Sequence, residues 1–160
     1  MSLEQIQPSQ IQLGPTKVLV LDCSIACKIF LEEVGSVEAR NQIAEHLTNG
    51  EALVALTLLR MELYLAAFNN DNEPGLAIQA LEALLAAGLE LIEPSETVMS
   101  KAFGIARIGN KKQGWPSLQD SIYHALALDL GAKFWTADHR HIAKTQHLGG
   151  LELFCANVAV

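Results

Sequence analysis

Length, composition and charge limit what this chain can be. Its 160 residues, half of them apolar, are enough to bury the core of one domain without disulfides or a structural metal. No apolar run reaches the ~18 residues that a membrane-spanning helix needs, and the net charge of −7 argues at first sight against a nucleic-acid partner.

The chain opens with a polar stretch, residues 1–16, that lacks the basic start and the apolar segment of a signal peptide. We expect a flexible leader there and a single domain over residues 17–160. The three cysteines, Cys23, Cys27 and Cys155, have no metal-ligand spacing and cannot all pair. This favours a reducing, cytoplasmic setting.

Strands and helices are predicted to alternate along the rest of the chain. A continuous apolar run predicts a strand buried on both faces over residues 17–22. Further strands are predicted over 52–56, 89–92 and 133–136, and an edge strand over 151–154. Caps, glycines and prolines delimit predicted helices over 24–33, 36–49, 57–68, 76–87, 94–108, 118–130 and 139–146. Ser36 is the expected N-cap of the second helix. The alternation predicts an α/β/α fold of three layers, with a central, mostly parallel sheet of four to five strands.

Four acidic residues stand where a metal-dependent nuclease would place its ligands. Asp22 ends the first predicted strand and Asp138 follows the fourth, and parallel sheets bind ligands at the carboxyl ends of their strands. Asp120 begins a helix after a polar loop, and Glu62 lies in an otherwise apolar helix. Like charges held together resist ionisation unless a cation neutralises them, and carboxylate oxygens select Mg²⁺ or Mn²⁺.

Each acid also has a purely structural interpretation. Asp22 and Asp138 could cap the helices that follow them, and Asp120 completes a capping box with Ser117. Glu62 is harder to explain in this way, because its helical neighbours on the same face are apolar and an unpaired buried carboxylate is costly. A metal ion would offset that cost, and so would a salt bridge from another part of the fold.

The segments around these acids carry recognisable motifs. Residues 20–33 read as a strand ending in Asp, then a small residue, Ser, and an apolar helix with Lys and a terminal Glu pair. Residues 58–65 surround Glu62, residues 118–127 begin a helix with an acid, and residues 130–138 form a strand leading to Thr-x-Asp. Together these segments resemble the PIN-domain family, particularly its VapC-type toxin ribonucleases.

The resemblance implies a metal-dependent ribonuclease with a PIN-like fold. The acids that match the family's motifs would hold one or two Mg²⁺ or Mn²⁺ ions: Asp22, Glu62, Asp120 and Asp138. Ser24 and Thr136 would orient these carboxylates or bound water. The implied reaction is hydrolysis of an RNA phosphodiester by metal-activated water.

The same resemblance implies partners. The protein would be the toxin of a toxin–antitoxin pair and would form a homodimer. An antitoxin helix could dock in an apolar groove flanked by residues 23–33 and 36–49.

Two other functions fit the same sequence. A non-catalytic PIN-like module would bind RNA or protein and use its carboxylates only as helix caps, and a housekeeping nuclease would process RNA without an antitoxin. Caps alone would tolerate Ser, Thr or Asn. Acids at all four positions therefore favour an enzyme.

The distribution of charge along the chain makes an RNA partner compatible with the negative net charge. Residues 1–100 carry 4 basic and 14 acidic side chains, a balance of −10, whereas residues 101–147 carry 7 basic and 3 acidic, a balance of +4. We predict that the basic residues nearest to the acids contact the RNA backbone: Lys111, Lys112, Arg140 and Lys144. Trp115 would either stack on a base or anchor its loop on the core. The five histidines show no metal-ligand spacing, and we expect surface or packing roles for them.

Overall fold

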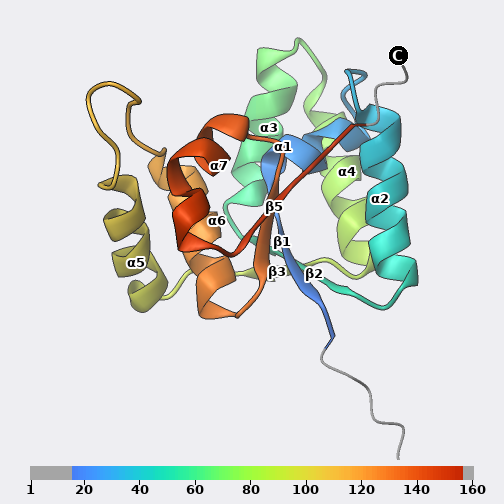
Figure 1. Ribbon diagram of the computed structural model, residues 1–160. Coiled ribbons are helices and arrows are strands. Elements are labelled where there is room, and N and C mark those ends of the chain that lie inside the picture. Colours follow the sequence, from blue (N-terminus) through green and yellow to red (C-terminus); the bar gives the residue numbers. More distant parts are fainter. Residues whose placement is uncertain (1–15, 157–160) are drawn as a thin grey trace, which may run out of the picture.

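Five strands form a parallel sheet at the centre of the molecule (Figure 1). The computed structural model describes residues 16–156, so the predicted leader lies outside them except for its last residue. The strands are β1 (Val18–Leu21), β2 (Ala52–Leu56), β3 (Glu90–Ile92), β4 (Lys133–Thr136) and β5 (Leu151–Leu153). Their order across the sheet is β3-β2-β1-β4-β5, and each neighbouring pair is parallel.

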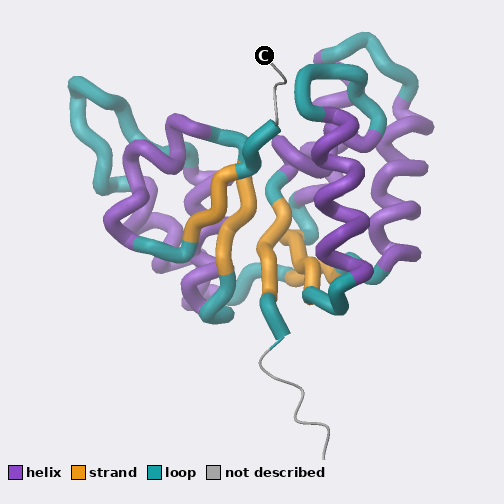
Figure 2. The backbone as a smooth tube through the Cα atoms, turned by 45° about the vertical axis from the view of Figure 1, so that its right-hand side comes forward, coloured by secondary structure: helices purple, strands orange, loops and turns teal. Residues whose placement is uncertain are grey.

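Helices cover both faces of this sheet (Figure 2), with α2 and α4 on one side and α5, α6 and α7 on the other. The α-helices are α1 (Cys23–Ala26), α2 (Ser36–Thr48), α3 (Leu59–Asn69), α4 (Pro74–Ala87), α5 (Glu96–Ala106), α6 (Leu118–Asp129) and α7 (His139–Thr145). Two short 3₁₀ helices are η1 (Cys27–Ile29) and η2 (Gln146–Leu148). The predicted three-layer α/β/α arrangement is confirmed.

The middle strands are buried on both faces, as their continuous apolar sequences predicted. Leu19 and Leu21 of β1 and Phe134 of β4 have no exposed surface. The register pairs Leu21 with Trp135, which sets the carboxyl ends of β1 and β4 side by side. These ends lie at the upper edge of the sheet in Figure 1, and this edge holds the candidate site.

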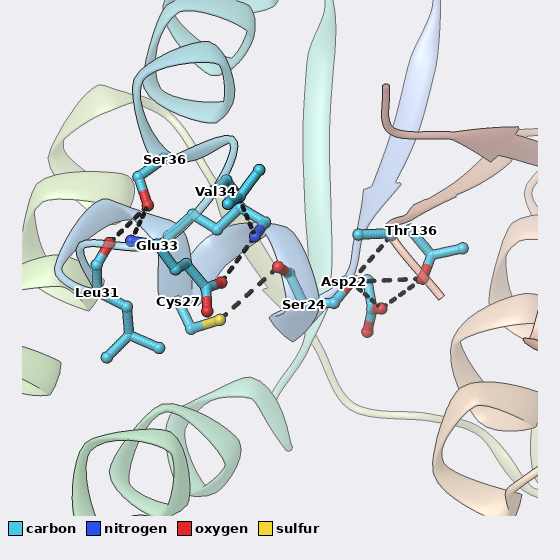
Figure 3. Close-up of polar contacts among 10 residues, drawn as sticks. Asp22, Ser24, Cys27, Leu31, Glu33, Val34, Ser36 and Thr136 are labelled. Carbon is cyan, nitrogen blue, oxygen red and sulfur yellow. Dashed lines mark hydrogen bonds and ion pairs between the residues drawn. The ribbon is translucent and has the colours of Figure 1, made fainter. Parts of the chain in front are cut away.

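The helix predicted over residues 24–33 is much shorter, because a loop takes over its second half. The Lys28 ammonium is buried and donates to Glu33 Oε1 at 2.7 Å and to the Val34 carbonyl at 3.0 Å. Ser36 is not the N-cap of α2 either: Gly35, with φ of 85°, holds that position. The Ser36 hydroxyl instead donates to the Leu31 carbonyl at 2.6 Å and accepts from the Glu33 amide at 3.0 Å, closing the loop (Figure 3).

The other boundaries differ by a few residues at most. Helix α4 begins at Pro74, two residues before the predicted start, since proline fits the first turn of a helix. Helix α5 begins at Glu96 and not at Pro94, because Ser95 caps it by accepting a hydrogen bond from the Val98 amide at 3.2 Å. Within residues 16–156, no helix has both the length and the apolar character needed to cross a membrane.

Candidate active site

The predicted acids gather around the adjoining ends of β1 and β4. Asp22 directly follows β1, and Asp138 lies two residues beyond β4. Asp120 is in the first turn of α6, a helix that packs against both strands, and Glu62 is in the first turn of α3. The fold therefore brings residues that are up to 116 positions apart in the sequence to one edge of the sheet.

Asp22 is the most deeply buried of these acids, with 4% of its surface exposed. One of its oxygens, Oδ2, accepts hydrogen bonds from the hydroxyls of Ser24 and Thr136, both at 2.6 Å (Figure 3). Its side chain caps no helix, so the helix-cap interpretation is wrong for this residue. Burial raises the Asp22 pKa to about 7, with a further rise from the charge of Asp120.

Ser24 and Thr136 connect the two strand ends as well as binding Asp22. The Ser24 hydroxyl accepts from the Ala137 amide, and the Thr136 hydroxyl accepts from the Asp138 amide, each at 3.0 Å. With these acceptor positions used, each hydroxyl directs its single proton to Asp22. The two residues thereby hold α1 against the end of β4 and fix the orientation of the carboxylate.

Glu62 has a partner that the sequence did not reveal. The hydroxyl of Tyr123, a residue with no exposed surface, donates to Glu62 Oε2 at 2.6 Å. The sole sequence signal for this contact is the place of Tyr123 one turn beyond Asp120 on the same helix. Burial raises the Glu62 pKa, while the Tyr123 hydrogen bond lowers it and the charge of Asp120 raises it.

Asp120 and Asp138 do act as the structural interpretation foresaw. The Ser117 hydroxyl accepts from the Asp120 amide at 3.0 Å and donates to Asp120 Oδ2 at 2.7 Å. Asp138 Oδ1 caps α7 by accepting from the amides of Arg140 and His141. Burial raises the Asp120 pKa, the Ser117 hydrogen bond lowers it, and the charge of Asp138 raises it. Helix capping and membership of an acidic cluster therefore coexist here.

The donors at this site are suited to a hard divalent cation. Each of the four carboxylates accepts these hydrogen bonds through one of its two oxygens. Oxygen donors of this kind match Mg²⁺ and Mn²⁺. In the part of the chain that the structure describes, no group of three or more Asp, Glu, His or Cys side chains is arranged so that it could hold a metal ion. The site is thus a set of mutually repelling carboxylates and not a closed ligand cage.

The predicted RNA-binding residues fall into two groups. Arg140 and Lys144 line one cavity of about 270 Å³ together with Gln113 and Ala143. Lys111 and Lys112 are exposed further along the loop between α5 and α6. The structure therefore brings Arg140 and Lys144 together at a cavity, which Lys111 and Lys112 do not line.

Two histidines have a contact that sequence spacing did not predict. His124 of α6 and His141 of α7 are both buried, and their ring nitrogens Nδ1 and Nε2 lie 3.1 Å apart. His124 Nε2 also lies 2.7 Å from the Gly149 carbonyl. The expected packing role holds for this pair, which joins the helices that begin at Asp120 and Asp138.

An apolar groove is lined by both of the segments expected to flank it, and by α4 as well. It has a volume of about 220 Å³ and runs between α2 and α4, with Ile29, Ile43, Leu47 and Leu84 among its lining residues. From residues 23–33 only Ile29 of η1 lines it, because the expected helix ends early, and α4 forms the wall opposite α2.

Comparison with known proteins identifies the fold. No protein-family model and no curated protein matches this sequence. A chain in the crystal structure of VapBC2 from Rickettsia felis, bound to a DNA fragment from their promoter, matches with a TM-score of 0.64. The match is 14% identical and covers 86% of this chain and 97% of that one.

A second solved structure agrees with the first. VapC20 of Mycobacterium tuberculosis, described as a sarcin-ricin loop cleaving toxin, matches with a TM-score of 0.56. Identity is again 14%, over 79% of this chain and 94% of that one. The chain therefore has the VapC-type PIN-domain fold that its motifs resemble.

Proposed function

We propose that this protein is a metal-dependent endoribonuclease that acts as the toxin of a toxin–antitoxin pair in the cytoplasm. The observation that carries the proposal is the cluster of four carboxylates at the adjoining ends of β1 and β4, in a fold shared with a toxin that cleaves the sarcin-ricin loop. Asp22, Glu62, Asp120 and Asp138 are its proposed metal ligands.

The cost of assembling these acids supports a catalytic role over a purely structural one. Burial and neighbouring negative charge raise the pKa values of Asp22, Glu62 and Asp120. A helix cap gains nothing from such burial, and Asp22 caps no helix with its side chain. A non-catalytic module that uses its carboxylates as helix caps would explain Asp120 and Asp138. It would not explain why Asp22 and Glu62 are acidic.

The protein groups have distinct tasks in this proposal. Ser24 and Thr136 hold the Asp22 carboxylate in one orientation, and Tyr123 does the same for Glu62. Asp22, Glu62, Asp120 and Asp138 would hold a divalent cation, which would supply Lewis-acid activation of water and neutralise charge at the phosphate. Arg140 and Lys144 attract the RNA backbone to the same edge of the sheet.

Exposed apolar surface supports the proposed protein partners. Met61, Leu65 and Phe68 lie along one side of α3 and are 65%, 54% and 78% exposed. The groove between α2 and α4 adds a concave apolar surface. An antitoxin helix in this groove and a second copy of the chain are the partners that we propose for these surfaces.

Cleavage of RNA by the purified full-length chain tests the enzymatic proposal. We expect a single-stranded RNA to be cut in the presence of Mg²⁺ or Mn²⁺ and to stay intact with EDTA. Asp22→Asn and Asp138→Asn should abolish cleavage, whereas Glu82→Gln, at an exposed position on α4, should not. Cleavage at the wild-type rate by both Asn variants would contradict the assignment, and the same variants control for a co-purified nuclease.

A further inference from the structure

The loop between α5 and α6, at the left of Figure 1, presents an aromatic side chain on a fixed backbone. Asn110 and Gly114 exchange backbone hydrogen bonds of 3.2 and 2.7 Å, and Asn110 Oδ1 accepts from the amides of Lys112 and Gln113. The Lys144 ammonium donates to the Trp115 carbonyl at 3.1 Å. These contacts tie the loop to α7 just before the chain enters α6.

Trp115 is not anchored on the core, which was one of its two predicted roles. Its side chain is 53% exposed. The Cγ atom lies close to Gly109, where an added β-carbon would stand only 2.8 Å from it. One side of the indole is thus supported by the loop backbone, and much of the remainder is open to solvent.

The cavity lined by Gln113, Arg140, Ala143 and Lys144 adjoins this tryptophan, because Lys144 contacts its backbone. Arg140 and Lys144 make the cavity positively charged. The cavity is also close to the carboxylates: Ser117, two residues after Trp115, donates to Asp120. The same edge of the molecule therefore holds Trp115, then the pair Arg140 and Lys144, and then the proposed metal ligands.

We propose that Trp115 and this cavity form a subsite for one nucleotide of single-stranded RNA next to the cleaved bond. The base stacks on the exposed indole, and the adjoining phosphate binds Arg140 and Lys144. Stacking of this kind tolerates any base but requires an unpaired one, since a base within a duplex offers no free face. This proposal rests on the proposed nuclease function, and it specifies single-stranded RNA as the substrate.

Intrinsic fluorescence can report on this subsite without any cleavage. The chain has two tryptophans, and the other, Trp135, is 1% exposed. We expect a short single-stranded RNA, added to the full-length protein in EDTA, to quench the emission of Trp115. The same RNA annealed to its complement should quench it much less. In Trp115→Phe the quenching should disappear while binding, followed by anisotropy of a labelled RNA, is largely kept.

Truncation and charge variants measure the contribution of each part. Trp115→Ala should weaken RNA binding by about tenfold or more, the loss expected for one stacked base. Lys144→Ala should weaken binding and make it less dependent on salt. The matched control is Lys133→Ala, which removes a positive charge at the opposite end of β4 and should bind like the wild type. Thermal unfolding of each variant verifies that it folds.

The outcomes separate this subsite from the nuclease itself. Unchanged affinity of Trp115→Ala, or RNA binding without quenching in the wild type, would overturn the subsite even if the protein cleaves RNA with Mg²⁺. Quenching and a weakened Trp115→Ala variant would support it even if no cleavage is found, in which case the nuclease proposal alone fails. Absence of any RNA binding by the wild type would overturn the subsite as well.

Discussion

The Asp22 carboxyl group is buried, accepts two hydroxyl hydrogen bonds and lies within the electrostatic reach of Asp120 and Glu62. Two short hydrogen bonds would ordinarily favour the charged form. Burial outweighs them, because its effect on the pKa is the largest of all contributions. The metal-free protein therefore holds this residue near the midpoint of its titration at neutral pH.

The elevated pKa of Asp22 makes stability depend on pH in a defined direction. The folded protein binds the proton more tightly than the unfolded chain, so stability falls as pH rises from the ordinary pKa of 3.8 to about 7. The difference corresponds to a free energy on the order of 4 kcal/mol. We expect Asp22→Asn to raise the melting temperature without metal at pH 8, and to do so far less at pH 4.

Thermal unfolding at the two pH values, with and without Mg²⁺, measures this effect. Mg²⁺ should stabilise the wild type at pH 8 but not the Asn variant, because only the wild type gains by neutralising the carboxylate. Glu82→Gln on α4 is the matched control for loss of an exposed negative charge. A variant less stable than the wild type at both pH values would contradict the prediction.

The Tyr123 hydroxyl is expected to stabilise the fold and to orient the Glu62 carboxylate. Tyr123→Phe removes the hydrogen bond to Glu62 and leaves the burial of that carboxylate uncompensated. We expect a loss of about 1–3 kcal/mol in unfolding free energy and about a 10- to 100-fold loss in Mn²⁺ affinity, as for other groups that orient a ligand. Isothermal titration with Mn²⁺ checks the second effect.

Tyr64→Phe provides the control, because the Tyr64 hydroxyl has no hydrogen bond within residues 16–156 and its loss should alter neither quantity. Equal Mn²⁺ affinity for Tyr123→Phe and the wild type would show that Glu62 does not depend on this hydroxyl. That result would leave the hydrogen bond a structural feature only.

Hydrogen bonds determine the tautomers of His124 on α6 and His141 on α7. His124 Nε2 donates to the Gly149 carbonyl, so His124 Nδ1 is an acceptor for His141 Nε2–H. This leaves His141 Nδ1 as a bare acceptor, and it is the one buried side-chain nitrogen or oxygen without a partner in the described residues. Protonation of either ring would remove an acceptor or bury a charge.

This arrangement predicts sensitivity to acid. Burial lowers the pKa of His141 from 6.5 to about 4, so the folded state prefers the neutral ring. The stability that this ring contributes is complete above pH 6.5 and is lost as the pH falls towards 4, to a total on the order of 3 kcal/mol. Asp22 has the opposite trend, so the effect is best measured with Asp22→Asn as the background.

We expect that background variant to lose stability between pH 6.5 and 4, and His141→Gln added to it to reduce the loss. Glutamine keeps an amide donor for His124 but has no proton to gain. Urea unfolding at a series of pH values gives the comparison. An identical loss in both variants would show that other groups cause the acid sensitivity.

The elements themselves were largely predictable from local patterns. Strands β2 and β4 have the predicted bounds. Both are short runs of apolar or aromatic residues that follow a turn, and this pattern is typical of a buried strand. The segment after Asp22 was predicted as one helix because its apolar spacing is helical. The contacts of Lys28 with Glu33 and Val34 end that helix, and local sequence carries no information about such a loop.

At the scale of the molecule, the sequence predicted which acids meet but not how they are held. A parallel sheet brings the ends of β1 and β4 together whatever the side chains are, so strand-end acids were identifiable. The contacts between Tyr123 and Glu62, and between His124 and His141, join residues from different elements. These depend on the packing of helices on the sheet, which no spacing rule encodes.

The proposed biological role can be tested on the whole molecule in a living cell. A ribonuclease without its antitoxin degrades RNA that the host needs, so strong expression of the chain alone should arrest the growth of a bacterial host. Asp22→Asn should relieve the arrest although it removes only one proposed metal ligand, and Glu82→Gln should not. Growth curves with protein levels matched by immunoblot make the comparison quantitative.

Normal growth at high levels of protein that cleaves RNA in vitro would contradict the toxin role and favour a housekeeping nuclease. Arrest by the Asn variant as well would trace the toxicity to a surface of the fold and not to its carboxylates.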